Sequence, residues 1–241
     1  MLTRAALAQM LSYPGVRPRL RRTSIDELLQ PGQRPLAGVA ATPVVTFSSV
    51  SSLRGALAGD ALPAGTAAVL YDPEAWPYTP RSEQRDPASA AAQAARLAHA
   101  HGLKLIVAPA LNLTTVLRPA SSAPHWRTFL DLGIAGSVAR VADEVELQAQ
   151  SLERDPAMYT AFVRAAAAQA RSAHPGVTVL AGLSTNPPGA PVDSGQLTDA
   201  VRQSRADVQG YWLNIPGNGP RCPACGATRP SVGAAVLSNV L

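Results

Sequence analysis

The feature that most constrains the fold is a regular alternation of short apolar or β-branched runs with Ala-rich stretches of helical character. Successive apolar runs begin about 23 to 40 residues apart. That spacing fits a strand, a loop and a helix rather than a hairpin. The expected strands are 44–48, 67–72, 103–108, 143–150, 177–184 and 208–215. The alternation predicts a parallel sheet covered by helices, as in α/β proteins.

Two of the expected helices begin with the same local signal. Asp86 and Asp155 each precede a proline, so each carboxylate is placed to cap a helix whose first position is occupied by proline. Gly102 follows the first of these helices and is expected to end it. The expected helices are 51–57, 87–101, 156–173, 195–205 and 232–241.

The loops after the strands distinguish an open sheet from a barrel. An open nucleotide-binding sheet carries a Gly-rich turn after its first strand, and residues 48–55, SSVSSLRG, contain no such turn. The loops are instead long and rich in Trp, Tyr, Asn and Pro, as on the catalytic face of a (β/α)8 barrel. Six expected strands are fewer than eight. The predicted fold is therefore α/β, an incomplete or distorted TIM-like parallel (β/α) barrel that forms a single domain over residues 43–241.

The positive charge is concentrated near the N-terminus. Residues 1–34 carry six Arg and two acidic residues, whereas the rest of the chain is nearly neutral although the formal net charge is +5. A nucleic-acid-binding protein normally carries its basic surface on the folded domain, so no nucleic-acid partner is expected. Residues 1–42 are expected to form a basic, partly disordered leader. A short amphipathic helix, or a segment that contacts a membrane surface or an acidic partner, is the alternative.

Several other classes of protein are disfavoured by the sequence. No apolar run approaches the roughly 20 residues needed to cross a bilayer, so no integral membrane segment is expected. Residues 1–22 do not match a signal peptide, because Gln9 interrupts the apolar stretch and basic residues follow it. No His, Asp or Glu pair has the spacing of metal ligands, so no metal or other cofactor is expected. The sequence does not determine the oligomeric state.

The two cysteines lie close together in the motif Cys222-Pro-Ala-Cys225. The surrounding loop, PGNGPRCPACGATRP, is rich in Pro and Gly, whereas a redox-active motif of this kind normally opens a helix. A small structural disulfide is therefore expected, with free thiols and redox chemistry as the alternatives. A disulfide would imply an oxidising compartment.

The most informative segment is 143–150, DEVELQAQ. Alternate side chains of a strand share one face, so Glu146, Gln148 and Gln150 face the same way. A parallel strand packed on both faces reads as a nearly continuous apolar run, so this polar face must meet water or a polar cavity. The segment is either an edge strand or a barrel strand with its polar side chains inward. The apolar strands on either side favour the barrel.

A second cluster, Tyr71-Asp72-Pro73-Glu74-Ala75-Trp76, stands at the end of the expected strand 67–72. Carboxylates transfer protons and aromatic rings stack on sugars, so this combination suits acid–base chemistry on a sugar-like ligand. Asp72 and Glu74 are therefore candidate catalytic residues, with Tyr71 and Trp76 as binding residues. The alternative is a proline turn in which Asp72 accepts backbone hydrogen bonds.

Two further strand ends carry polar or aromatic side chains. Ser184 and Asn186 are placed to hydrogen-bond a ligand, although Asn186 also fits a simple Asn-Pro turn. Trp212 and Asn214 share one face of the last expected strand. There, Trp212 either forms the floor of a sugar subsite or packs in the core. The complete set of candidate binding residues is Tyr71, Trp76, Gln148, Gln150, Ser184, Asn186, Trp212 and Asn214.

Four blocks of the sequence resemble a set of poorly characterised actinobacterial proteins with glycoside-hydrolase-like TIM barrels. The blocks are YDPEAWPYTPRSEQRDP, ADEVELQAQSLERDP, LAGLSTNPPGAPV and GYWLNIPG, and the resemblance covers about residues 43–241. It implies a barrel and a secreted protein, although residues 1–22 lack the signal that members usually carry. Carboxylates at strand ends are in addition analogous to those of glycosidases in general.

The sequence therefore predicts a carbohydrate-active, glycoside-hydrolase-like barrel enzyme with a small-molecule or oligosaccharide ligand. Glu146 is expected to oppose Asp72 or Glu74 across the barrel mouth, as the base or nucleophile that faces a general acid. Two alternatives stay open: an isomerase, cyclase or lyase of secondary metabolism on the same barrel, and a ligand-binding barrel without catalysis. The substrate, the stereochemical course and the compartment are not determined by the sequence.

Overall fold

The computed structural model describes residues 1–21, 24–189, 191–219 and 222–240. In these residues, eight strands form one sheet, and they follow one another in chain order. Every neighbouring pair is parallel. The strands are β1 (Leu2–Thr3), β2 (Asp26–Leu29), β3 (Thr42–Phe47), β4 (Ala68–Tyr71), β5 (Lys104–Val107), β6 (Glu144–Leu147), β7 (Thr178–Ser184) and β8 (Gly210–Asn214).

The two edges of the sheet meet, which makes it a nearly closed barrel. The backbone nitrogen of Met1 donates to the carbonyl of Tyr211 at 2.6 Å, and Leu213 N–H donates to the carbonyl of Met1 at 3.1 Å. These contacts bring β8 back to β1. The predicted incomplete TIM-like barrel is therefore confirmed.

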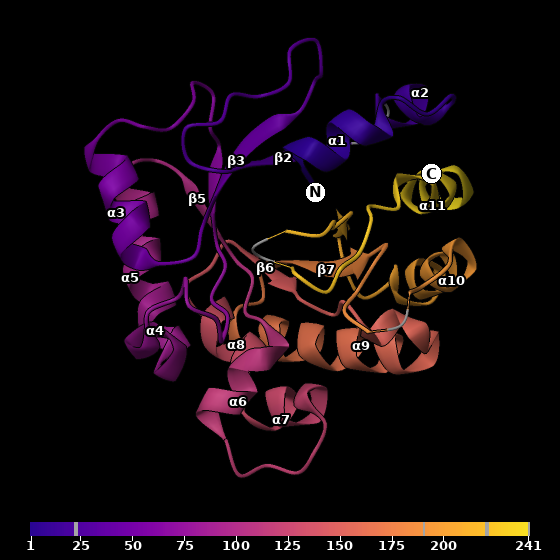
Figure 1. The fold of residues 1–241 in the computed structure, drawn as a ribbon. Coiled ribbons are helices and arrows are strands. Elements are labelled where there is room, and N and C mark those ends of the chain that lie inside the picture. Colours follow the sequence, from indigo (N-terminus) through magenta and orange to yellow (C-terminus); the bar gives the residue numbers. More distant parts are fainter. Residues whose placement is uncertain (22–23, 190, 220–221, 241) are drawn as a thin grey trace.

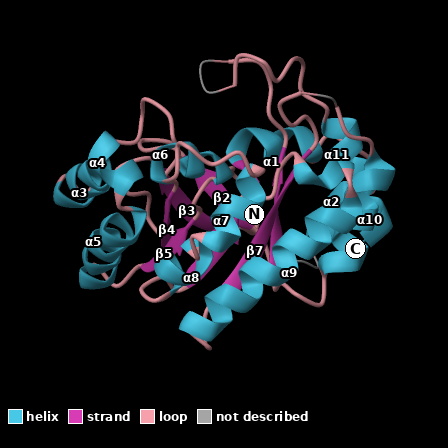
Figure 2. Ribbon diagram, turned by 90° about the horizontal axis from the view of Figure 1, so that it is seen from below, coloured by secondary structure: helices cyan, strands magenta, loops and turns pink. Residues whose placement is uncertain are grey.

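Helices surround the strands, and the long loops gather at one end (Figures 1 and 2). The α-helices are α1 (Arg4–Met10), α2 (Val16–Leu20), α3 (Val50–Ala58), α4 (Arg81–Arg85), α5 (Pro87–Ala100), α6 (Thr114–Leu117), α7 (His125–Asp131), α8 (Ile134–Ala139), α9 (Pro156–Ala173), α10 (Ser194–Ser204) and α11 (Pro230–Val240). Two 3-10 helices are η1 (Leu111–Leu113) and η2 (Leu152–Arg154). Across the described parts of the chain, no helix is long and apolar enough to span a membrane.

The two aspartate caps lie where the sequence predicts them. Asp86 accepts a hydrogen bond from Ser89 N–H at 3.0 Å, and Asp155 accepts from Met158 N–H at 3.1 Å. Each cap precedes a helix that begins with proline. Gly102, just beyond α5, has a φ of 70°, a left-handed conformation that favours glycine at a helix end.

Residues 1–42 are not a leader outside the barrel, and this corrects the expectation drawn from their charge. β1 pairs with β2, β2 pairs with β3, and α1 packs against α11. The sequence pattern did not predict these two strands, because β1 has only two residues and β2 reads DELL, with two acids at its start. Residues 22–23 of this segment lie outside the described chain.

The connection between β2 and β3 is a loop, residues 30–41, where a regular barrel has a helix (Figure 1). Leu36 and Val39 of this loop pack against the main core. Glu27, on the outer face of β2, accepts hydrogen bonds from Leu36 N–H at 3.0 and 3.1 Å. Burial raises the pKa of Glu27. The loop thus covers the outer face of these strands and completes the shell without a helix.

Strand parity divides the apolar residues into two cores. The larger core lies between the sheet and the helices and takes alternate strand residues such as Val69 and Tyr71. The smaller core includes the intervening residues, among them Leu70 and Trp212, which face the interior of the barrel. Since alternate strand residues point to opposite faces, Asp72 continues the inward row of β4. The carboxyl ends of the strands therefore present their inward side chains at one mouth.

Removal of residues 1–29 is expected to abolish cooperative folding, because it deletes β1 and β2 and exposes the edge of β3. Thermal melting followed by circular dichroism is the measurement. Arg17 is exposed, so Arg17→Gln serves as the control and should leave the melting temperature unchanged. A shortened chain that melts like the parent would show that these strands are dispensable.

Candidate active site

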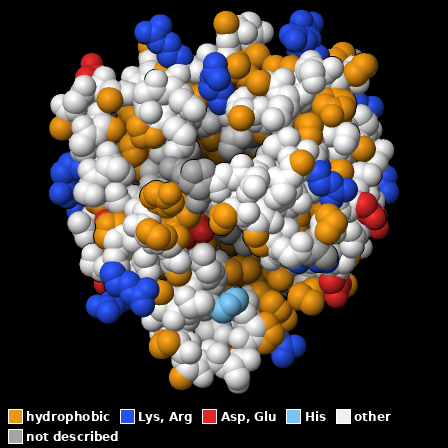
Figure 3. Space-filling view, in the orientation of Figure 1, with side chains coloured by type: hydrophobic (Ala, Val, Ile, Leu, Met, Phe, Trp, Pro, Cys, Tyr) orange, Lys and Arg blue, Asp and Glu red, His pale blue; other side chains and the backbone are white. Residues whose placement is uncertain are grey.

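A pocket of about 790 Å³ opens at the mouth formed by the carboxyl ends of the strands. Each strand contributes a residue from its carboxyl end or just beyond it: Thr3, Gln30, Thr46, Asp72, Ala110, Gln148, Ser184 and Asn214. The face in Figure 3 has a central hollow, with acidic side-chain atoms inside it. This is the end of a barrel at which active sites of this architecture form.

Asp72 lies deep in the pocket and is held by an amide from the end of β6, two strands away in the sheet. Its side chain is only 6% exposed, and Gln148 Nε2 donates to its Oδ1 at 2.6 Å. The same Gln148 nitrogen also donates to the carbonyl of Ala108 at 2.8 Å. Because one amide bonds both groups, the ends of β4, β5 and β6 are fixed relative to one another.

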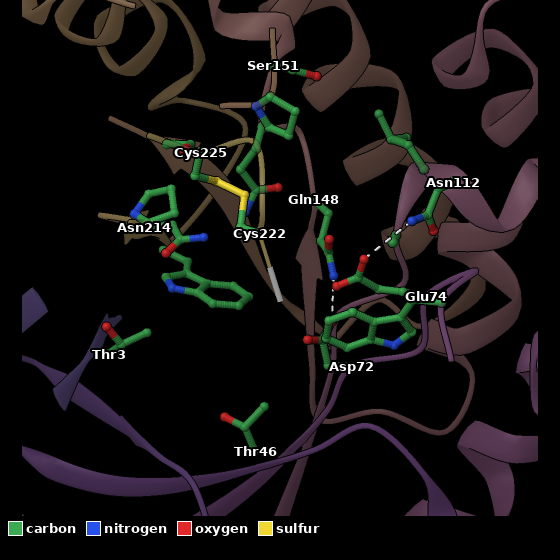
Figure 4. A pocket seen from close by; sticks show the side chains of 18 of the residues that line it. Thr3, Thr46, Asp72, Glu74, Asn112, Gln148, Ser151, Asn214, Cys222 and Cys225 are labelled. Atoms are coloured by element: carbon green, nitrogen blue, oxygen red, sulfur yellow. Dashed lines mark hydrogen bonds between the residues drawn. A yellow bond between two sulfur atoms is a disulfide. The ribbon is translucent and has the colours of Figure 1, made fainter. Parts of the chain in front are cut away.

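Glu74 follows Asp72 by two residues and also lines the pocket. Asn112 Nδ2 donates to Glu74 Oε2 at 3.3 Å, and Asn112 Oδ1 accepts from Ala75 N–H at 2.8 Å. In Figure 4, Asp72 and Glu74 lie on one side of the pocket, and Asn214 and a disulfide lie on the other. The two carboxylates therefore come from one strand end and do not oppose each other across the mouth.

All three tryptophans of the chain line this one pocket. Trp212 belongs to the core inside the barrel and is 8% exposed, so it forms part of the floor. Trp76 donates from Nε1 to Thr79 Oγ1 at 2.8 Å, which fixes its ring beside Glu74. Trp126, in α7, lines the pocket as well. Indole rings next to amides, hydroxyls and carboxylates are a favourable surface for a polyhydroxylated ligand, because a ring face accepts the apolar side of a sugar.

The polar side chains of the segment DEVELQAQ face inward, although the expected strand 143–150 is shorter than predicted: β6 ends at Leu147, and Gln148 and Gln150 lie in the loop after it. Gln148 and Gln150 line the pocket. Glu146 lies within β6, two residues before Gln148. It is fully buried and is not among the lining residues. Within the described residues, neither of its carboxyl oxygens has a hydrogen-bond partner. The expected pair of Glu146 with Asp72 or Glu74 across the mouth is therefore absent, because Glu146 lies beneath the floor.

Gly182 of β7 leaves the space that Glu146 and Gln150 occupy. A methyl group at this position would come within 2.6 Å of Glu146 Oε1 and 2.5 Å of Gln150 Nε2. Burial raises the pKa of Glu146 well above its ordinary value, and the negative charge of Asp72 adds to the rise. Both effects favour the neutral carboxylic acid. Glu146 is therefore packed inside the barrel in surroundings that raise its pKa.

A second buried carboxyl supports the end of β7. β6 pairs with β7 only as far as Leu147 and Ala181, so the next part of β7 needs other partners. Glu153, in η2, accepts a hydrogen bond from Ser184 N–H at 2.8 Å. Burial raises the pKa of Glu153 to about 7. Glu153 thus holds in place the backbone of Ser184, whose side chain lines the pocket.

Two of the predicted binding residues do not reach the pocket. Tyr71 is fully buried on the outer face of β4, where its hydroxyl donates to Glu83 Oε2 at 2.8 Å. It is one residue before Asp72 and therefore has the opposite parity. Asn186 donates from Nδ2 to the carbonyl of Ala227 at 3.1 Å, which ties two loops together. Both residues are structural in this fold.

The loop after β8 forms the remaining wall of the pocket. Cys222 and Cys225 form a disulfide with a Cα–Cα distance of 5.4 Å, and both line the pocket. Asn218 N–H donates to the carbonyl of Gly226 at 2.6 Å, which closes the loop around the disulfide. Asn214, at the end of β8, lines the same side.

Sequence reasoning missed several residues of the pocket. Asn112, His125 and Trp126 all belong to the long connection between β5 and β6, which shows no periodic signal that would indicate which side chains face inward. Thr3 and Gln30 lie in the segment expected to be a leader. Within the described chain, no group of three or more His, Cys, Asp or Glu residues is placed to hold a metal ion.

Comparison with known proteins supports the fold. No protein-family model matches the chain, and no curated protein sequence matches it. Among solved structures, a chitinase from Chromobacterium violaceum ATCC 12472 is 13% identical, with a TM-score of 0.52, over 100% of this chain and 98% of that one. A glucosidase from Croceicoccus marinus is 14% identical, with a TM-score of 0.51, over 84% of this chain and 51% of the glucosidase. This chain therefore has a barrel similar in fold to those of glycoside hydrolases.

Glu153→Gln is expected to remove a pH-dependent loss of stability. The folded-state pKa of about 7 exceeds the ordinary value of 4.5, so the carboxyl favours folding most below pH 4.5, and this stability is lost as the pH rises toward 7. Melting temperatures of the two proteins should agree near pH 4.5, and the variant should gain relative to the parent up to about pH 7. A constant difference across this range would contradict the assignment.

Glu146→Gln is expected to stabilise the protein at neutral pH, because glutamine has nearly the same shape and needs no proton to remain neutral. The raised pKa of Glu146 makes its stabilising effect greatest below the ordinary value of 4.5, with a decline as the pH rises above it. Denaturant unfolding at pH 5 and pH 8 measures the difference. Glu146→Leu is the matched comparison, since it shows whether a polar group is needed at all. A Glu146→Gln protein less stable than the parent at pH 8 would show that the charged form is favoured.

Proposed function

We propose that the protein is a glycoside hydrolase whose reaction depends on Glu74 and Asp72. The observation that carries this proposal is that one pocket combines two carboxylates from the end of β4 with all three tryptophans of the chain. The similar barrels of the chitinase and the glucosidase are consistent with it. Fold similarity alone does not define an activity, so the proposal depends on the site.

Glu74 is the proposed general acid. It lines the pocket beside Trp76, and Asn112 holds one of its oxygens. In the reaction, Glu74 donates a proton to the glycosidic oxygen as the bond from the sugar carbon to that oxygen breaks. A water molecule then supplies the hydroxyl of the product, and its proton returns to Glu74.

Asp72 has a supporting role in this proposal. It lies deeper than Glu74, and Gln148 fixes its orientation through the 2.6 Å hydrogen bond. A fixed carboxylate next to the reacting sugar stabilises the positive charge that develops on the ring in the transition state. Asn214, Ser184 and Gln150 then bind hydroxyl groups, and Trp212 lies beneath the ring.

The positions of Asp72 and Glu74 also limit which group can attack the sugar carbon. Among the described lining residues, the only carboxylates are Asp72 and Glu74, and they come from the same strand end. Mechanisms that use two opposed carboxylates need one on each face of the sugar. The attacking group is therefore either water placed by amides or a group of the substrate itself, such as a 2-acetamido substituent.

The same observation favours one alternative, a sugar-binding barrel without catalysis. Its pocket would use the same tryptophans and amides, and the two carboxylates would only hydrogen-bond the ligand. Turnover distinguishes the two functions.

The test is hydrolysis of aryl glycosides and oligosaccharides, with and without a 2-acetamido group. Glu74→Gln should lower kcat by about 10²- to 10⁴-fold, the usual contribution of general acid–base catalysis. Asp72→Asn should also lower kcat, because the neutral amide stabilises the developing charge less. Asp131 has an exposed side chain, so Asp131→Asn is the matched control and should retain the parent rate.

Two outcomes would contradict the proposal. A parent protein that binds saccharides without hydrolysing any of the panel would identify the sugar-binding alternative. Parent-level rates in both Glu74→Gln and Asp72→Asn would exclude these carboxylates from the reaction.

A further inference from the structure

The connection between β5 and β6 carries two pocket residues, His125 and Trp126, that have no assigned role in the proposed bond cleavage. It contains η1, α6, α7 and α8 between Val107 and Glu144. Two of its residues, His125 and Trp126 at the start of α7, line the pocket. Trp126 is half-buried and His125 is exposed, so one side of the pocket ends in an accessible aromatic wall.

This wall is fixed to the strand end that bears the carboxylates. Asn112, in η1, bonds both Ala75 N–H and the Glu74 carboxylate, at 2.8 and 3.3 Å. His125 Nδ1 lies 2.7 Å from the hydroxyl of Thr114, a buried residue of α6. The loop with Trp126 is therefore held against the loop with Glu74, and the two line one continuous pocket.

The ring of Trp126 is itself held in place. The Arg127 guanidinium lies over it, 4.9 Å from the ring centroid, and the ring also packs against the main core. A ring with a fixed orientation loses little conformational freedom when a ligand stacks on it. The adjacent exposed imidazole of His125 can donate or accept a hydrogen bond with a sugar hydroxyl.

We propose that Trp126 and His125 form a second sugar-binding subsite, next to the one at Glu74. The ligand is then an oligosaccharide of at least two units. The end of this oligosaccharide that is farther from the bond to be broken lies on α7. The inference rests on the proposed function and extends it to the class of substrate. The volume of about 790 Å³ is in the upper part of the roughly 300–1,000 Å³ range of ligand pockets and leaves room beyond one sugar ring.

The experiment measures binding, so that it is independent of turnover. Glu74→Gln protein is titrated calorimetrically with chito- and cello-oligosaccharides of one to four units. Affinity should rise by about tenfold or more between the monosaccharide and a longer chain, the gain expected from one added stacking contact with its hydrogen bond. The double variant Glu74→Gln/Trp126→Ala should lose this gain, and its monosaccharide affinity should stay within about twofold of that of Glu74→Gln.

Two further variants keep the test independent of folding. Trp126→Phe retains an aromatic face and should keep most of the gain with chain length. His125 is exposed, so His125→Ala should fold normally and lose a smaller part of the gain. Thermal melting of each variant confirms that the protein is folded.

The possible failures are distinguishable. A gain with chain length that persists in Trp126→Ala and His125→Ala would overturn the subsite and leave the proposed hydrolase intact. Equal affinity for all chain lengths in the starting protein would do the same. If no saccharide binds and the parent hydrolyses none, the proposed function fails, and the subsite fails with it.

Discussion

The structure depends on the two-residue period of parallel strands that close into a ring. Once β1 meets β8, every strand has one row of side chains inside the barrel and one row against the helices. The inward row of each strand ends at the same mouth, so residues far apart in the chain are brought together. Gln148 and Asp72 are 76 residues apart and form a 2.6 Å hydrogen bond there. The pocket is thus a consequence of closure.

Closure has an energetic cost where the inward row is charged or polar. Glu146 is fully buried, and its carboxyl lacks a protein partner in the described residues. An unpaired carboxylate in that position is unfavourable, so burial raises the pKa of the group. Glu153 is also buried, at the end of β7. One of its carboxyl oxygens accepts a hydrogen bond from Ser184 N–H, and the other has no hydrogen-bond partner in the described residues. Glu146 lies inside the barrel, Glu153 lies in η2, and both acids are next to the pocket. Buried groups that lower the stability of the fold are typically found at or near functional sites.

The pocket is asymmetric around the barrel. The part formed by β4, β5 and their loops carries both carboxylates, Asn112 and two of the three tryptophans. The part formed by β1, β2 and β3 contributes the polar side chains of Thr3, Gln30 and Thr46, and it has a loop, residues 30–41, in place of one helix. Chemistry and aromatic binding are therefore concentrated on the side where the loops are longest and hydrogen-bonded to one another.

The sequence by itself determined the repeated strand–helix order, the two aspartate-capped helices and the inward polar face of β6. These features depend on local signals, namely side-chain periodicity and helix capping, which act over a few residues. It also located Asp72, Glu74, Trp76 and Trp212 at strand ends. It could not place β1 and β2, whose short and acidic segments become strands only because the neighbouring strands supply hydrogen bonds. Tertiary structure alone decided that Glu146 lies below the floor and that Trp126 reaches the pocket. Depth along a barrel and the path of a long loop depend on closure and packing between distant segments, and neither leaves a periodic pattern in the chain.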